Sequence, residues 1–340
     1  TGDPIPFASV LLQGTTIGNS TDFEGNFIIT SNSSADSVEA TYIGYLPQTK
    51  AIGTGKEITI NFQLRPSDIQ MEAFVFEAGE NPAFEIIRKA VDKKKQFDKR
   101  NLEAYDTKNY TKIEIDIDHV SEAFTKRKAV QKVTAVLDSI KQLTNDEGEK
   151  ILPVFFSETL SSFYFRNNPE LKKEVVEKSK VTGVGITDGS TASQITGSAF
   201  QEYNFYRNWL IILEKEFVSP IADGCEDSVY ALQVYPLRSQ DLAFSGTIWI
   251  NKDTYALKQV DLTIPKEANL NFIERIKIQQ ELLPTQQGPL IPSKTRVQVK
   301  IGQITPKTAG LLAKFYTTVD SVNTGNPKPT SFFNQAVVLE

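Results

Sequence analysis

Residues 244–264 restrict the possible fold of this chain more than any other stretch. Residues 246–250 alternate with the period of two that is typical of a half-buried strand, and residues 251–254 are polar residues that favour a turn. The return strand places Val260, Leu262 and Ile264 on one face. The stretch therefore predicts a long two-stranded unit of a curved antiparallel sheet.

Trp249 is the largest apolar side chain of this predicted hairpin. It alternates with Ile248 and Ile250, so one of the two sets must lie on the outer side of the sheet. We expect Trp249 to face the concave side, covered by a helix.

Length and composition indicate a globular protein of two domains. A chain of 340 residues exceeds one ordinary core, and 40% hydrophobic with 23% charged residues is unlike a disordered chain. The net charge of -5 argues against nucleic acid as a partner. The single Cys225 excludes a disulfide framework within the chain, and no apolar run approaches the roughly 20 residues of a membrane span. The first residues resemble the interior of a domain, so we expect the sequence to begin after a processed leader.

Residues 1–66 predict a small β-sandwich. Four short runs, 7–12, 26–30, 37–42 and 57–64, are rich in β-branched and aromatic residues and are separated by turn signals. Asp22 can accept bonds from backbone N–H groups in a tight turn, and Gly25 can adopt a positive φ.

The pattern PIPFASVLLQGTTIGNSTDFEGNF, followed by TYIGY, resembles the carboxypeptidase-regulatory-like domain. The resemblance implies a prealbumin-like sandwich that is not catalytic. We therefore expect a first domain at 1–76, including a linker strand, that neither binds zinc nor hydrolyses peptides. The second domain is expected at 77–340.

Residues 83–97 predict an amphipathic helix. Asn81 and Pro82 suit its N-cap and first position, and Phe84, Ile87 and Val91 recur at helical spacing. The basic residues at its end have two explanations. One is a contact with anionic lipid. The other, which we favour, is a solvated last turn in which positive charges are stabilised by the negative end of the helix dipole.

The remaining pattern predicts an α+β domain. Residues 105–120 and 152–165 read as strands, residues 130–140 as a second helix and residues 194–217 as partly helical, and long strands follow from residue 242. The predicted fold class is mostly β with some α: a β-sandwich, then a long curved antiparallel sheet, similar to a half-barrel, packed on helices.

Few residues suggest chemistry. Asp116, Asp118 and His119 resemble metal ligands, but on a strand His119 would point away from the two carboxylates, so a solvated strand face is favoured. Glu158 is expected on the outer face of its strand, and Cys225 has no activating base nearby in the sequence. We predict no catalytic, metal-binding or cofactor-binding residue, and no cofactor.

Five segments together resemble an outer-membrane-associated family of Bacteroidetes, in which a regulatory-like domain precedes a region of unknown function. They are GENPAFEIIRKAVDKKKQ, FFSETLSSFYFRNNPELKKEVVEKSKVTGV, NFYRNWLIILEKEFVSPIADG, AFSGTIWINKDTYALKQVDLTI and ANLNFIERIKIQQE. The resemblance implies a periplasmic location at the outer membrane. It also implies partners among envelope proteins, including a membrane barrel formed by a following C-terminal region or by a separate chain.

Two helices ahead of a curved sheet, with the hairpin GxIWI-turn-YALKQV, also resemble the LolA and LolB lipoprotein-carrier fold. This resemblance implies a non-enzymatic module that acts as a protein-interaction scaffold or as a carrier of lipid or lipoprotein. The alternative is a carboxylate-dependent hydrolase of envelope glycans or peptides. Core packing is the simpler explanation of the crowded aromatic residues near 203–209, but a groove between helix and sheet remains open. The residues of that groove would be Phe84, Ile87, Val91, Tyr203, Tyr206, Trp209 and Trp249.

Overall fold

The computed structural model describes two compact units, Thr1–Gly79 and Glu80–Glu340. The division lies three residues beyond the boundary expected from the sequence. The described residues are 4–13, 15, 17–31, 35–42, 45–53, 55, 57–66, 82–118, 151–183, 205–206, 210–212, 215–217, 225–226, 229–236, 238, 241–264, 266–268, 270, 272–302 and 309–335.

The first unit is a small β unit with its own core. Its four-stranded sheet has the order β2 (Gly18–Ser20), β1 (Ser9–Leu12), β3 (Ser37–Thr41), β5 (Gln48–Ala51), and β4 (Tyr45–Leu46) pairs with β6 (Arg65–Pro66). Residues 26–30 and 57–64 were predicted as strands. They form no strand in the structure, but alternate apolar side chains of both segments pack against the core. The core residues are Val10, Leu12, Val38 and Ala40, with Phe27, Ile29, Ile60, Phe62 and Leu64 packed against them.

The predicted turn at Asp22 is confirmed. One oxygen of Asp22, Oδ1, accepts hydrogen bonds from the backbone N–H groups of Glu24 (3.0 Å) and Asn26 (2.7 Å). Gly25 has φ of +76°, a conformation that glycine adopts without the steric cost of a Cβ.

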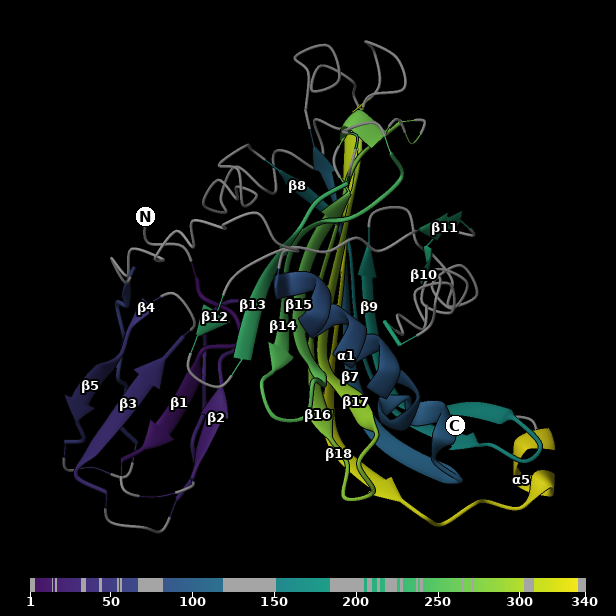
Figure 1. The fold of residues 1–340 in the computed structure, drawn as a ribbon, viewed down its shortest axis with the longest axis horizontal. Helices are drawn as coiled ribbons and strands as arrows, with labels where there is room; N and C mark the ends of the chain where they lie inside the picture. Colours follow the sequence, from purple (N-terminus) through teal and green to yellow (C-terminus); the bar gives the residue numbers. More distant parts are fainter. Residues whose placement is uncertain are drawn as a thin grey trace. The chain divides into compact units, whose positions relative to one another are not determined.

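The second unit is built on one ten-stranded antiparallel sheet (Figure 1). Its order is β12-β13-β14-β15-β16-β17-β18-β7-β8-β9. The predicted meander of long strands after residue 242 is therefore confirmed, and so is the mostly β fold class. The strands are β7 (Ala104–Asp118), β8 (Leu152–Arg166), β9 (Leu171–Gly183), β12 (Cys225–Glu226), β13 (Val229–Val234), β14 (Ser245–Asn251), β15 (Leu257–Ile264), β16 (Ile273–Pro284), β17 (Leu290–Ile301) and β18 (Gly310–Thr324).

The second unit also contains several shorter elements. Helix α1 (Pro82–Phe97) begins at the predicted proline and leads through a 3-10 turn, η1 (Lys99–Asn101), into β7. A second 3-10 turn, η2 (Lys266–Ala268), and a short helix, α5 (Thr330–Asn334), follow later. Strands β10 (Leu210–Ile212) and β11 (Lys215–Phe217) pair with each other, so the described part of the region predicted as partly helical consists of these two strands and a turn at 205–206. The helix predicted near residues 130–140 lies outside the described residues.

The two faces of the large sheet differ in chemistry. Residues paired across antiparallel strands point to the same side, so the strand register defines each face. On the apolar face, a continuous row crosses five strands; its members are Leu262, Ile278, Val297, Phe315 and Ile113. The opposite, charged face carries Asp261, Lys277, Lys300, Lys314 and Asp116.

The expected orientation of Trp249 is wrong. Ile248 and Ile250 belong to the core cluster on the apolar face, where α1 packs, so the alternation of the strand places Trp249 on the charged face. Trp249 is nevertheless buried. Both sides of β14 are covered, and size alone could not decide which apolar set faces the helix.

Candidate functional site

Helix α1 lies across the apolar face (Figure 1). Ala83 is buried in the main core cluster, and Ile86, Ile87 and Ala90 pack against it. These residues recur at positions i, i+3, i+4 and i+7, which form one stripe of a helix. The helix is therefore fixed to the sheet by small and branched side chains.

Only Ile87 of the three helix residues predicted to line a groove contacts this core. Phe84 is 46% exposed and Val91 is 58% exposed, so neither lines a closed interior. Both lie on the flank of α1, beside the stripe that packs on the sheet. Helical periodicity over 15 residues does not separate the packed stripe from its neighbouring flank.

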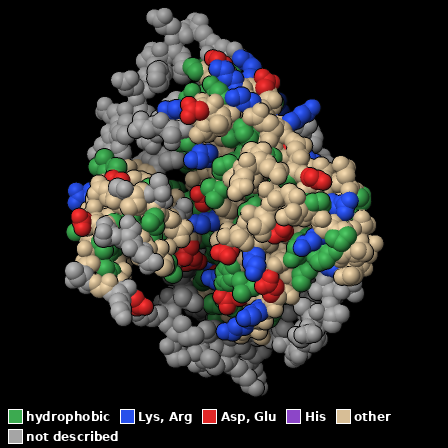
Figure 2. Space-filling view, turned by 90° about the horizontal axis from the view of Figure 1, so that it is seen from below, with side chains coloured by type: hydrophobic (Ala, Val, Ile, Leu, Met, Phe, Trp, Pro, Cys, Tyr) green, Lys and Arg blue, Asp and Glu red, His purple; other side chains and the backbone are tan. Residues whose placement is uncertain are grey.

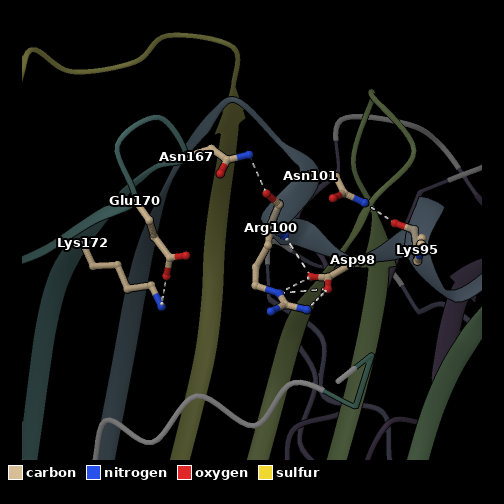
Figure 3. Close-up of polar contacts among 7 residues, drawn as sticks. All are labelled: Lys95, Asp98, Arg100, Asn101, Asn167, Glu170 and Lys172. Carbon is tan, nitrogen blue, oxygen red and sulfur yellow. Dashed lines mark hydrogen bonds and ion pairs between the residues drawn. The ribbon is translucent and has the colours of Figure 1, made fainter. Parts of the chain in front are cut away.

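The end of α1 is anchored by Asp98, which is buried. Its carboxylate accepts a hydrogen bond from the backbone N–H of Arg100 (3.0 Å) and forms an ion pair with the guanidinium of the same residue (Figure 3). The side-chain amide of Asn101 donates to the carbonyl of Lys95, and that of Asn167 donates to the carbonyl of Arg100 (2.9 Å). The junction thus ties the helix, the start of β7 and the turn after β8 together.

The β14–β15 hairpin holds the middle of α1. The ammonium groups of Lys89 and Lys93 lie 5.3 Å and 4.9 Å from the centre of the Tyr255 ring, and Lys89 Nζ donates to the Tyr255 hydroxyl (3.4 Å). Cation–π contacts of this kind are favourable. Part of the basic surface of α1 therefore faces the hairpin, and the sequence pattern had not suggested this partner.

Tyr206 belongs to a second, smaller cluster at the end of α1. It packs with Phe97, Ala256, Leu282 and Leu290. Its hydroxyl accepts from the backbone N–H of Leu257 (3.1 Å) and lies 3.4 Å from the carbonyl of the same residue, to which it donates. Burial raises the pKa of this hydroxyl. Tyr206 is thus a core residue with its polar atom paired, whereas Tyr203 and Trp209 lie outside the described residues.

The apolar face extends well beyond the core residues of β13–β17 on which α1 packs. Ile113, Ile115, Phe155 and Phe315 continue it over β18, β7 and β8. The ten strands are separated by nine intervals of about 4.8 Å, so the sheet is roughly 43 Å across. A helix is only about 10 Å in diameter. Within the described ranges, α1 spans only part of this width, and beyond it Ile115 and Phe315 stay half-buried whereas Ile113 and Phe155 are buried.

A row of polar side chains interrupts this apolar face, and we call it the hydroxyl band. It crosses six neighbouring strands in register, and its members are Gln280, Thr295, Thr317, Thr111, Thr159 and Ser179. Gln280 Nε2 donates to Thr295 Oγ1 (3.0 Å), and the hydroxyls of Thr159 and Ser179 are 3.2 Å apart.

The centre of the band is buried and incompletely paired. Thr111 and the adjacent Asn109 and Ser157 are 5%, 8% and 1% exposed. Thr111 Oγ1, Asn109 Oδ1 and Ser157 Oγ have no hydrogen-bond partner within the described part of the chain. Sequence reasoning missed this feature. The sequence did contain an indication of it: residues 109 and 111 alternate in step with the apolar Ile113 and Ile115, so all four side chains must lie on the same face of the strand.

The charged face corrects the expectation for Asp116 and Asp118. They do share one side of β7, but they are 3% and 0% exposed rather than solvated. Lys314 Nζ lies 2.9 Å from Asp116 Oδ2, and Lys300 Nζ lies 3.4 Å from Asp118 Oδ2. Burial raises the pKa of Asp116, and the positive charge of Lys314 opposes this shift.

The other residues considered for chemistry take structural positions or are not described. Glu158 accepts a hydrogen bond from the Tyr110 hydroxyl (2.6 Å) on the charged face. Within the described ranges, no group of three or more His, Cys, Asp or Glu residues could hold a metal ion. His119 and the side chain of Cys225 lie outside what the structure describes.

Comparisons with solved structures show only weak likeness. A domain whose name assigns it to outer membrane lipoprotein sorting, from Vibrio parahaemolyticus, has 7% identity and a TM-score of 0.25, with 74% of this chain and 96% of that chain covered. A LolA superfamily protein from Nitrosomonas europaea has 10% identity and a TM-score of 0.26, over 74% and 97%. Lipovitellin has 7% identity and a TM-score of 0.28, over 71% and 27%.

Sequence comparisons divide the chain as the structure does. No curated protein matches it. None of the described helices has the length and apolar character needed to cross a membrane. Residues 1–76 match the CarboxypepD_reg-like domain, as the sequence motifs predicted. Residues 86–319, well over half of the chain, match a second model, and the chain therefore belongs to the Family of unknown function (DUF5686).

Proposed function

We propose that the second unit carries a lipid or a lipid-modified protein on the apolar face of its sheet. The observation that carries the proposal is the width of that face compared with α1, the helix that packs on its core residues in the described part of the chain. Ile115 and Phe315 are only half-buried, although they continue the row of core residues. An acyl chain is the ligand that such a strip of branched and aromatic side chains suits.

The energetics favour an apolar occupant. Apolar surface left in water costs about 25 cal/mol per Å², and each buried methylene of a ligand contributes about 0.8 kcal/mol. An acyl chain lying along the half-buried Ile115 and Phe315 would gain this free energy without new covalent chemistry. The protein would act by binding and release, not by catalysis.

The proposed location is the periplasm at the outer membrane, with envelope proteins as partners and no nucleic acid. The net charge of -5 supports the last point. On the face drawn in Figure 2, Lys and Arg side chains are mixed with Asp and Glu, as on a surface without a field of one sign. If no lipid binds, an interaction scaffold is the remaining non-enzymatic function.

Native mass spectrometry of the protein, gently extracted from membranes, tests the carrier function. We expect a bound lipid on the wild-type chain. Ala313→Phe places a large ring on the apolar face, between Val299 and Ile115, and should remove the lipid. Thr318→Phe is the matched control, because it places the same ring on the opposite face of the same strand. Absence of lipid from the wild type, or equal occupancy in both variants, contradicts the proposal.

The same preparations also test the alternative, a carboxylate-dependent hydrolase. The pair Asp116 and Asp118, buried on one side of β7, is the observation that favours it. Both carboxylates face lysines, which explains them as a structural network. Hydrolysis of envelope glycans or peptides that is lost in Asp116→Asn with the fold retained would favour the enzyme over the carrier.

A further inference from the structure

The hydroxyl band offers hydrogen bonds in the middle of an apolar surface. Buried polar atoms are paired in most proteins, and an unpaired one costs free energy. Three neighbouring side chains, Asn109, Thr111 and Ser157, each keep an unpartnered oxygen among the described residues. They lie on two adjacent strands, where Asn109 is opposite Ser161, Thr111 is opposite Thr159 and Ile113 is opposite Ser157. The open atoms are therefore clustered, not scattered.

The rows that flank the cluster contain no charged side chain. The rows on either side of the band on β18, β7, β8 and β9 consist of Val319, Asn109, Ser161 and Val176, and of Phe315, Ile113, Ser157 and Val181. Glu174, further along β9, is an acid whose pKa is raised by burial, against the effect of the Ser161 hydroxyl, and it offers no positive charge to an anion. A phosphate or carboxylate placed here would lose its hydration without gaining a counter-charge.

We infer that the centre of the hydroxyl band, Thr111 with the flanking Asn109 and Ser157, binds the uncharged, hydroxyl-bearing glycerol group of the carried lipid. This inference rests on the proposed carrier function. The carbonyl oxygen of Asn109 accepts a hydrogen bond from the ligand, and the hydroxyls of Thr111 and Ser157 donate or accept. The acyl chain continues from the band along the half-buried Phe315 and Ile115.

Three ligands with the same acyl chain test the inference on the full chain: 1-monopalmitoylglycerol, palmitate and methyl palmitate, titrated in native mass spectrometry. We expect the wild type to bind monopalmitoylglycerol about tenfold more tightly than palmitate. The double variant Thr111→Val, Ser157→Ala should lose about tenfold in affinity for monopalmitoylglycerol and clearly less for methyl palmitate, whose ester can accept a hydrogen bond but carries no donor.

Thr318→Val is the matched control, since it removes the same hydroxyl from the charged face. The thermal midpoint of the ligand-free double variant should equal or exceed that of the wild type, because buried unpartnered oxygens have been removed. Tight binding of palmitate with weak binding of monopalmitoylglycerol, or unchanged affinity in the double variant, overturns the inference but leaves the carrier function standing. A wild type that binds none of the three ligands overturns both.

Discussion

At the scale of single residues, Asp116 and Asp118 are carboxylates buried on one side of β7 and paired with lysines of neighbouring strands. The alternation in residues 113–118 placed Asp116 and Asp118 on one side of a strand, and this is confirmed. Their exposure was misjudged because alternating charge usually indicates a solvated face. Here opposite charges from β17 and β18, residues 300 and 314, lie beside them. Pairing across strands separated by almost 200 residues leaves no local pattern in the sequence.

Lys314→Met should destabilise the second unit by about 3 kcal/mol at neutral pH, because it leaves Asp116 buried without its partner. The pKa of Asp116 in the folded protein is already raised by burial, and loss of Lys314 raises it further. When a carboxyl has a higher pKa in the folded than in the unfolded state, the protein loses stability as pH rises above the unfolded-state pKa, which is about 3.9 for Asp. The deficit of the variant should therefore shrink as pH falls towards that value, in denaturant titrations against pH.

Two controls separate this effect from general disruption. Lys258→Met removes an exposed lysine and should change stability little. The double change Lys314→Met, Asp116→Leu removes both buried charges and should recover much of the loss. Two further acids face this ion pair. Glu114 has its carboxylate 3.9 Å from Lys314 Nζ, and Asp118 places a like charge beside Asp116. A deficit that does not depend on pH would show that Asp116 does not govern the effect.

At the scale of elements, the β14–β15 hairpin was predictable because its turn is encoded locally. Asn251 Oδ1 accepts hydrogen bonds from the backbone N–H groups of Asp253 (3.1 Å) and Thr254 (2.9 Å) and from the Thr254 hydroxyl (3.0 Å). The function of the turn was not predictable. Tyr255, held at φ of +58°, meets two lysines of α1, which are more than 160 residues away in the sequence. The same limit explains why the hydroxyl band was missed, since it comes from six strands.

Asn251→Ala should cost about 1–2 kcal/mol, because three hydrogen bonds of the turn are lost and Tyr255 is no longer held against α1. Urea unfolding followed by tryptophan fluorescence would measure this, since Trp249 lies in the same hairpin. Asp253→Ala changes an exposed side chain two residues away and serves as the control, with little effect expected. Equal stability of the two variants would mean that the side chain of Asn251 does not hold the turn.

At the scale of the whole molecule, the sequence motifs divided the chain because each part carries a pattern of its own. The apolar runs of residues 1–66 form one cluster around Val10 and Val38. The long strands and α1 form other clusters, within residues 80–340. Each unit thus has the apolar core that independent folding requires. What the motifs could not give was the width of the large sheet, because strand order follows from pairing between distant segments.

We therefore predict two separate unfolding transitions in differential scanning calorimetry of the full chain. Unfolding enthalpy scales with size at about 0.7 kcal/mol per residue near 60 °C, so the units Thr1–Gly79 and Glu80–Glu340 should contribute roughly 55 and 180 kcal/mol. A chain of residues 80–340 should keep the larger transition at an unchanged midpoint, and addition of a bound lipid should raise that midpoint alone. A single transition, or a midpoint of the larger unit that shifts when residues 1–79 are removed, would show that the two units stabilise each other. The lipid would then have to be assigned to the whole chain instead of to the second unit.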